Sequence, residues 1–212
     1  MTNFIPIFPL EIVIFPGEQL NLHIFEPRYK QLINECFENK KPFGIPPVID
    51  NKLADYGTLI YAKEIFTTYE NGEMDIRTEG DSVFRILEII KEVPDKLYSG
   101  AIVNYPHNYF RGNSNVMKKL LAKMRELHVH LGISKNLQKS DADLTAYDIA
   151  RHSGLSLQQE YELLQLTDER HRQEYLKRHF ETAIPMVSEM NAVKEKIQMN
   201  GHFRNLDSRF SF

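Results

Sequence analysis

Histidine and carboxylate side chains are the groups in this 212-residue chain that could hold a metal ion or transfer a proton. His171 and His179 lie eight residues apart on one predicted helix, close to Asp168 and Glu169. Imidazole nitrogens and carboxylate oxygens are zinc ligands, so this group offers the components of a metal site. The alternative is that these side chains are charges on a solvated helix surface. We favour the second interpretation and predict no metal.

Two further pairs of residues are weaker candidates for metal ligands. Asp141 and Asp143 lie in the polar loop 139–145 and could contact a hard cation, but a calcium site draws on a longer series of ligands. His128 and His130 are two residues apart, which places them on different faces of a helix. Neither pair has the pattern of a metal centre, and we predict no cofactor.

The sequence motifs of several enzyme classes are absent. The chain has no Gly-Lys pair for a phosphate-binding P-loop, no G-x-S-x-G turn and no H-E-x-x-H helix. The single cysteine, Cys36, excludes an internal disulfide and a cysteine-built zinc site. Because Cys36 falls on the apolar stripe of a predicted helix, we expect a buried, unreactive thiol. We predict that the protein is not an enzyme.

Charge and hydropathy narrow the class of protein. Residues 1–110 hold 10 Lys+Arg and 16 Asp+Glu, a net charge of −6, whereas residues 111–212 hold 16 and 13, a net charge of +3. Neither half is basic enough to make nucleic acid the main partner. No apolar run approaches the ~20 residues of a membrane span, and the first residues lack the pattern of a secretory signal. The expected compartment is the cytoplasm.

The start of the chain has the most specific pattern of elements. The apolar run Phe4–Phe15 contains Pro6 and Pro9, and because proline cannot donate to a sheet ladder, this run is predicted at a sheet edge or bulge. A turn at Pro16-Gly17 and an alternating strand at residues 19–24 follow. A helix is then predicted from Pro27. Its apolar stripe consists of Tyr29, Leu32, Ile33, Cys36 and Phe37.

Glu26 and Arg28 stand where this strand passes into the helix. As a functional pair they could contact a substrate. As a structural pair, Glu26 would cap the helix through its unpaired N–H groups, and Arg28 would tie the helix to a neighbouring strand. We favour the structural interpretation. It applies equally to the turn residues Pro9, Pro16, Gly17, Gly57 and Gly80.

Short strands fill the rest of the first half. They are predicted at residues 43–49, 58–69, 74–78, 83–93 and 98–105. Asn71-Gly72 predicts a type I′ hairpin turn between two of them, and Gly80-Asp81 predicts another turn. With the single helix, these strands indicate a small closed or nearly closed β structure over residues 1–110.

Helical patterns occupy residues 111–212. The predicted helix boundaries are a stop at Gly132, a capping box from Ser156 to Gln159 and a cap at Thr167. The last helix is expected to kink or break at Pro185 and to end at Asn200-Gly201. These segments predict a bundle of four or five helices, and the whole chain is predicted to be α+β.

The opening stretch resembles the Lon amino-terminal, or substrate-binding, domain family, whose start reads like "lPlFPL…vvFPg…lpLhIFEpRY". The matching residues are Pro6, Phe8, Pro9, Leu10, Phe15, Pro16, Gly17, Leu20, Leu22, Ile24, Phe25, Glu26, Pro27, Arg28 and Tyr29. The likeness continues at Gly57, Gly80 and Arg85 and reaches about Ile197. It departs at residues 81–84, where the family has a more basic run.

The resemblance implies a PUA-like small β-barrel with one helix, followed by a helical bundle. Full-length relatives are ATP-driven proteases, but this chain has no room for their ATPase and protease modules, so a free-standing recognition domain is expected. The implied function is non-enzymatic recognition of unfolded or damaged polypeptides, as an adaptor. The implied partners are polypeptide clients and a separate Lon-type protease.

Exposed apolar surface is the feature that would recognise an unfolded chain, and an open sheet edge would add main-chain pairing. The candidates are Phe8 and Phe15 on the proline-broken edge, and the linker aromatics Tyr105, Tyr109 and Phe110. The alternative is that these side chains close the barrel or seal the two halves of the chain.

Three other functions stay open on the sequence. PUA-like folds also host RNA readers, although the acidic first half and the lack of a basic–aromatic stripe argue against RNA. A hydrolase would need a histidine–carboxylate pair in a deep polar pocket. An interaction domain could dimerise through its helices. The terminal Phe203, Phe210 and Phe212 are expected to fold back onto the bundle or to dock elsewhere.

Overall fold

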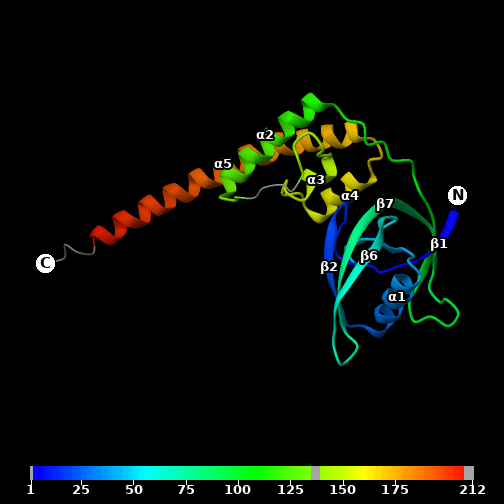
Figure 1. Cartoon of the computed structure of the whole chain (residues 1–212). Coiled ribbons are helices and arrows are strands. Elements are labelled where there is room, and N and C mark those ends of the chain that lie inside the picture. The colour runs from blue at the N-terminus through cyan, green and yellow to red at the C-terminus, as the bar shows by residue number, and fades with distance from the viewer. Residues whose placement is uncertain (1, 135–138, 208–212) are drawn as a thin grey trace. The chain divides into compact units, whose positions relative to one another are not determined.

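The computed structural model describes residues 2–134 and 139–207, with side chains described as far as residue 197. Phe203, Phe210 and Phe212 therefore lie outside the described side chains. The chain forms two compact units, one of Met1–Arg111 with Gly154–Arg172 and one of Gly112–Ser153 with Gln173–Phe212 (Figure 1). The division into a β subdomain, residues 1–110, and a helical subdomain, residues 111–212, stays a prediction.

An antiparallel sheet builds the first unit. Its strands are β1 Thr2–Pro6, β2 Gln19–Ile24, β3 Phe43–Ile45, β6 Tyr56–Thr68, β7 Met74–Ile90 and β8 Gly100–Asn104, beside a small pair of β4 Val48–Ile49 and β5 Lys52–Leu53. The strand order is β1-β8-β7-β6-β3, with β2 also paired to β7. The segment that follows β1 lies alongside β3. There the Phe8 N–H donates to the Gly44 carbonyl at 2.8 Å. The sheet is thus nearly closed, which confirms the predicted α+β class with a small β-barrel.

Strand β7 runs through Gly80-Asp81, so the turn predicted there is wrong. The Gly80 N–H donates to the Glu18 carbonyl at 2.9 Å, and the Gly17 N–H donates to the Gly80 carbonyl at 2.8 Å. A Cβ on residue 80 would lie 2.5 Å from the Phe15 carbonyl oxygen. Glycine is needed here because the turn at residues 15–18 crosses the strand at close range.

The hairpin between β6 and β7 does contain Asn71-Gly72, but it is not a type I′ turn. Only Gly72 has a positive φ, of 75°, and the Tyr69 N–H pairs with the Glu73 carbonyl across a longer loop. Two consecutive positive φ values, which type I′ requires, occur instead at Asp50 and Asn51 between β4 and β5.

Helix α1, Pro27–Glu38, packs beside β6 and buries four of the five predicted stripe residues. Phe37, the fifth, is exposed, so its predicted burial on this stripe is wrong. The buried face joins a core with β-strand residues such as Ile60 and Ile76. Burial raises the pKa of the Cys36 thiol to about 12, so the thiolate is scarce at neutral pH and the side chain behaves as a small apolar group.

The remaining helices are α2 Ser114–Leu131, α3 Ala146–Ala150, α4 Leu157–Gln165 and α5 Glu169–Asp207. Helix α2 ends at Gly132 with φ 66°, and α4 begins with the predicted Ser156 capping box. The α5 cap is Asp168 rather than Thr167, since the Asp168 carboxylate accepts from the Arg170 N–H at 2.8 Å.

Helix α5 continues through Pro185 and through Asn200-Gly201, so of the predicted kink or break at Pro185 the break is wrong, and so is the predicted end at Asn200-Gly201. Pro185 and Glu181 are exposed, and water can therefore solvate the Glu181 carbonyl that proline deprives of a donor. Within the described residues, no helix combines the length and the apolarity needed to cross a bilayer. The cytoplasmic location stays a prediction.

Candidate functional site

Phe8 and Phe15 lie in the interior of the first unit. They are 6% and 1% exposed, and the Phe8 ring stacks on Tyr29 with 3.9 Å between ring centroids. Their burial contradicts the interpretation of Phe8 and Phe15 as exposed contacts and agrees with the alternative that these side chains close the barrel. The edge is also occupied from Ile7 onward, since the Val48 N–H donates to the Leu10 carbonyl at 2.8 Å.

Tyr109 and Phe110 are both more than half exposed, on a firmly held segment of the first unit. The Tyr109 N–H donates to the Thr167 carbonyl at 2.7 Å, and the Glu169 N–H donates to the Tyr109 carbonyl at 2.9 Å. The buried guanidinium of Arg172 donates to the same Tyr109 carbonyl and lies 5.5 Å from the Phe110 ring centroid. These two rings are therefore displayed on a fixed backbone.

Tyr105, the third linker aromatic, is half-buried and packs against a second cluster of the core. Ile5, Phe84 and Val103 belong to that cluster. Tyr105 therefore offers less surface to a partner than Tyr109.

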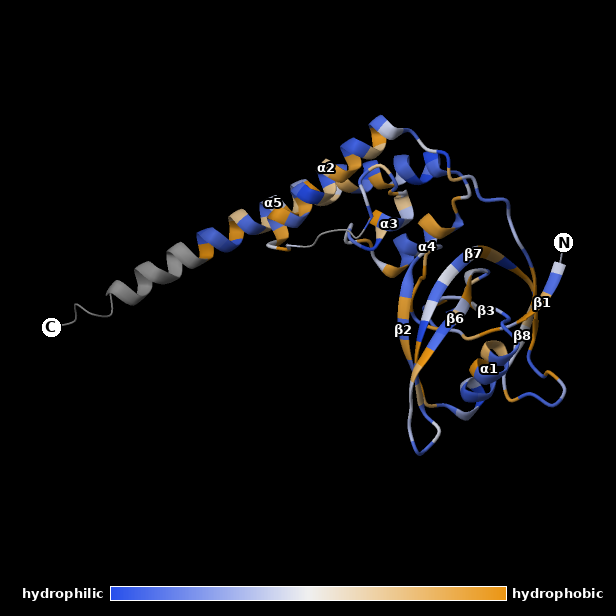
Figure 2. Ribbon diagram, in the orientation of Figure 1, coloured by the Kyte–Doolittle hydropathy of each residue, from blue (hydrophilic) through white to orange (hydrophobic). Residues whose placement is uncertain are grey.

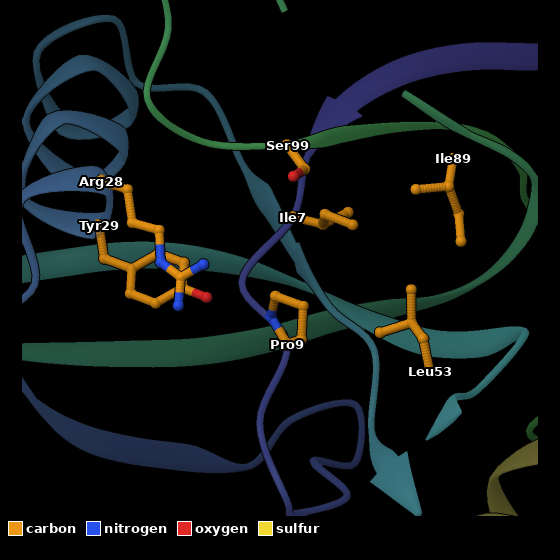
Figure 3. A pocket seen from close by; sticks show the side chains of 7 residues that line it. All are labelled: Ile7, Pro9, Arg28, Tyr29, Leu53, Ile89 and Ser99. Atoms are coloured by element: carbon orange, nitrogen blue, oxygen red, sulfur yellow. The ribbon is translucent and has the colours of Figure 1, made fainter. Parts of the chain in front are cut away.

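A pocket of about 240 Å³ opens on the barrel, and its lining includes Pro9, Arg28 and Tyr29 of the opening motif (Figure 3). Its lining consists of Ile7, Pro9, Arg28, Tyr29, Leu53, Ile89 and Ser99. Figure 3 shows Arg28 and Tyr29 on one side, Leu53 and Ile89 on the other, and the chain through Ile7 and Pro9 between them. Most of the wall is thus hydrocarbon, with a guanidinium at one side.

The prediction that Arg28 ties the helix to a neighbouring strand is wrong. The Arg28 side chain instead pairs with Glu26 at the start of its own helix. Its Nε donates to the Glu26 carboxylate at 2.9 Å and its terminal nitrogen lies 2.7 Å from the same oxygen, while the guanidinium stacks 4.6 Å from the Tyr29 ring centroid. Glu26 is the N-cap residue of α1, yet its side chain makes no cap hydrogen bond. The predicted carboxylate cap is therefore wrong, because Glu26 pairs with Arg28 instead.

This arrangement suits the binding of an apolar side chain with a polar group beside it. Leu53, Ile89 and Ile7 can contact hydrocarbon, and a planar guanidinium with five N–H donors keeps donors beyond the Glu26 pair for a carbonyl or carboxylate. The Ser99 hydroxyl, also in the lining, donates to the Lys91 carbonyl at 3.3 Å. The pocket thus combines apolar contact with hydrogen-bond donation, the usual composition of a ligand site.

Other motif residues serve the fold around this pocket. Gly17 has a φ of 83°, and the Glu18 N–H donates to the Phe15 carbonyl across the predicted turn at Pro16-Gly17. Arg85 lies over the Tyr56 ring, 5.7 Å from its centroid. Tyr56 and Arg85 are register partners on β6 and β7, so this contact belongs to the strand pairing itself.

Several of the residues considered as metal ligands have other partners. Asp168 pairs with Arg170 at 2.6 Å, and Asp141 pairs with Arg125 at 2.8 Å. The imidazole Nε2 of His179 lies 2.7 Å from the Ser153 carbonyl oxygen. Among the described residues, no three His, Cys, Asp or Glu side chains group as metal ligands would.

A histidine between two carboxylates lies on the exposed surface of β2 and β7. His23 Nδ1 lies 2.7 Å from Asp75 and Nε2 lies 3.2 Å from Glu73. The hydrogen bond with Asp75 is the main cause that raises the pKa of His23 above its usual value. The ion pairs therefore stabilise the fold below the unfolded pKa of about 6.5, and this stabilisation is lost as the pH rises through the folded pKa.

Replacing Asp75 with asparagine is expected to lower the His23 pKa, since the strongest acceptor for the imidazolium is lost. A proton NMR titration of the folded protein would follow the His23 ring signals in wild type and variant. Glu70→Gln is a matched control on the neighbouring hairpin loop and should leave the midpoint in place. Equal midpoints for wild type and Asp75→Asn would contradict the assignment.

Known proteins share both the sequence pattern and the fold described above. The sequence model of the ATP-dependent protease La (LON) substrate-binding domain matches residues 5–179, most of the chain. The chain therefore belongs to the LON substrate-binding domain family, as the opening motif predicted.

Two solved structures share the fold. The Lon N-terminal domain protein from Xanthomonas campestris has 24% sequence identity to this chain and superposes with a TM-score of 0.62. The match covers 83% of this chain and 98% of the Xanthomonas chain. The N-terminal domain of Mycobacterium avium complex Lon protease is 12% identical with a TM-score of 0.60, covering 85% and 99%. At these identities the likeness supports the architecture alone.

The sequence did not point to Leu53, Ile89 or Ser99 as site residues. They stand on separate segments: Ile89 lies on β7 and Ser99 directly before β8, which pairs with β7, whereas Leu53 lies on β5, which pairs with β4. The motif at Pro9, Arg28 and Tyr29 was a signal for one side of the pocket.

Proposed function

We propose that this protein recognises unfolded or damaged polypeptides and holds their exposed apolar side chains in the pocket beside Arg28. The chain belongs to a family of substrate-binding domains, and the observation that carries the proposal is the pocket itself. Its lining joins residues of the family-like opening stretch with Leu53 and Ile89. Unfolded chains differ from folded ones in presenting apolar side chains next to free main-chain carbonyls, and the pocket offers a contact for each.

The recognition is proposed to be non-enzymatic, with the bound chain passed to another protein. The family relationship suggests a separate Lon-type protease as that recipient. Tyr109 and Phe110, exposed on a fixed backbone, are proposed as a second apolar contact for a long client.

The test is a fluorescence anisotropy titration of the protein against a labelled, permanently unfolded polypeptide. A folded counterpart and a labelled single-stranded RNA run in parallel. Saturable binding to the unfolded chain alone is the expected result. Binding of RNA alone, lost at higher salt, would contradict polypeptide recognition and favour an RNA reader.

Replacing Ile89 with glutamate is expected to weaken binding of the unfolded chain by about tenfold or more, because a charge then enters the apolar wall and must lose water when a client binds. Leu87→Glu is the matched control, since Leu87 lies on the same strand and is 50% exposed against 43% for Ile89, yet does not line the pocket. Equal affinities of the two variants would remove the pocket from the proposal.

A further inference from the structure

An apolar stripe runs along the outer part of α5 in the second unit. It consists of Met186, Met190, Val193 and Ile197, each more than half exposed. Their spacings of four, three and four residues keep them on one face of a helix. Figure 2 shows hydrophobic positions recurring between hydrophilic ones along this part of α5.

The stripe is distinct from the face of α5 that packs inside its own unit. Leu176, Phe180 and Ile184 are buried on that inner face, and the Asn191 side chain donates to the His130 carbonyl of α2 at 2.6 Å. At 3.6 residues per turn, the inner face and the stripe lie about a third of a turn apart. The stripe therefore faces away from α2.

The spacing is that of the a and d positions of a coiled coil, with Met190 and Ile197 at a and Met186 and Val193 at d. Glu189 and Lys196 then take the g positions and Lys194 takes an e position. The flanks of the stripe thus carry both signs of charge.

We propose that this stripe is a self-association surface and that its occupant is α5 of a second copy of this chain. In a parallel pair, Glu189 of each copy faces Lys194 of the other, and in an antiparallel pair it faces Lys196. Both arrangements also bring the four apolar residues together. An unfolded client has no fixed spacing of apolar residues and no fixed opposite charge, so it fits this surface less well than a second copy does.

The association is expected to be weak, because only four apolar residues per copy contribute and two are flexible methionines. A dissociation constant on the order of 10 to 100 µM would correspond to a contact of this kind. The dimer is therefore expected to dominate only in concentrated samples.

Sedimentation velocity of the full chain over a range of concentrations tests the proposal. Met190→Glu is expected to raise the dissociation constant at least about tenfold, since it places a carboxylate from each copy in an apolar seam in either orientation. Ser188→Glu is the matched control, because it adds the same charge to the same helix on an exposed position away from the stripe. Far-ultraviolet circular dichroism should show unchanged helix content in both variants.

Charge exchange then identifies the orientation. Glu189→Lys should weaken the dimer, and a second change restores it, Lys194→Glu in a parallel pair or Lys196→Glu in an antiparallel pair. A wild-type chain that stays monomeric at the highest concentration would overturn the proposal, and so would equal association of Met190→Glu and wild type. If the wild type is monomeric and Met190→Glu loses the unfolded polypeptide, the stripe is a client surface instead.

Discussion

Replacing Arg172 with methionine is expected to destabilise the first unit by about 3 to 5 kcal/mol, because the buried Glu169 carboxylate loses the positive charge of the Arg172 guanidinium beside it. The Arg172 side chain is fully buried and its Nε lies 2.8 Å from Glu169. The guanidinium also donates to Asn108 at 2.7 Å, to the Leu166 carbonyl at 2.6 Å and to the Tyr109 carbonyl at 3.0 Å. Three further acceptors, all partly buried, thus lose a charged donor at once.

Urea unfolding followed by circular dichroism would measure this loss. Arg170→Met is the matched control, since that side chain is 70% exposed and pairs with Asp168 at the surface, where an ion pair is worth about 1 kcal/mol or less. Adding Glu169→Gln to Arg172→Met should recover part of the stability, because the buried negative charge that Arg172 neutralised is then removed. A similar small cost for the Arg170 and Arg172 variants would contradict the buried-pair account.

The role of Arg172 illustrates which features of this chain a sequence can predict. An arginine in a charged helical run is typical of a solvent-exposed position, and nothing near it signals burial. Its burial depends on residues 108–110, some sixty positions earlier, which the fold lays against residues 166–169. The partner contacts are therefore long-range in the sequence, and helical periodicity cannot reveal them.

Some local features could be predicted because their physical cause is local, although the turn type at Asn71-Gly72 and the caps at Glu26 and Thr167 were wrong. The Ser156 capping box, the stop at Gly132 and the turn at Pro16-Gly17 each depend on a few adjacent residues, and all three are present. Gly80 shows the opposite case. Its sequence context predicts a turn, but the need for glycine comes from the carbonyl of Phe15, which reaches the strand from far away in the sequence.

The pocket was not predicted from the sequence. The motif contains Pro9, Arg28 and Tyr29, but the sequence analysis assigned them to a turn, a structural ion pair and the apolar stripe of the helix. Phe8 and Phe15 carry the same motif but point inward, and an apolar run alone does not say which of its side chains face the core. Strand alternation is interrupted by prolines in this run, so the inward and outward positions could not be read by parity.

Replacing Gly57 with alanine is expected to lower the free energy of unfolding by about 3 kcal/mol, because the added methyl group has no room. A Cβ at this position would lie 2.6 Å from the Ile45 carbonyl oxygen, 2.6 Å from a ring carbon of Phe84 and 2.8 Å from Cα of Pro46. Two of these three atoms belong to the backbone, so a rotamer change cannot relieve the overlap. Strand β6 must instead move away from β3, to which it is hydrogen-bonded.

Gly132→Ala separates this packing effect from the general cost of losing a glycine. Gly132 has a φ of 66°, but no atom lies within 4 Å of its added Cβ, so alanine there is expected to cost about 1 kcal/mol through backbone strain alone. Urea unfolding of both variants gives the comparison. Equal losses would contradict the close approach of β3 and β6 at Gly57. A loss about three times larger for Gly57→Ala would instead show that this family-like glycine is required by the contact between these two strands.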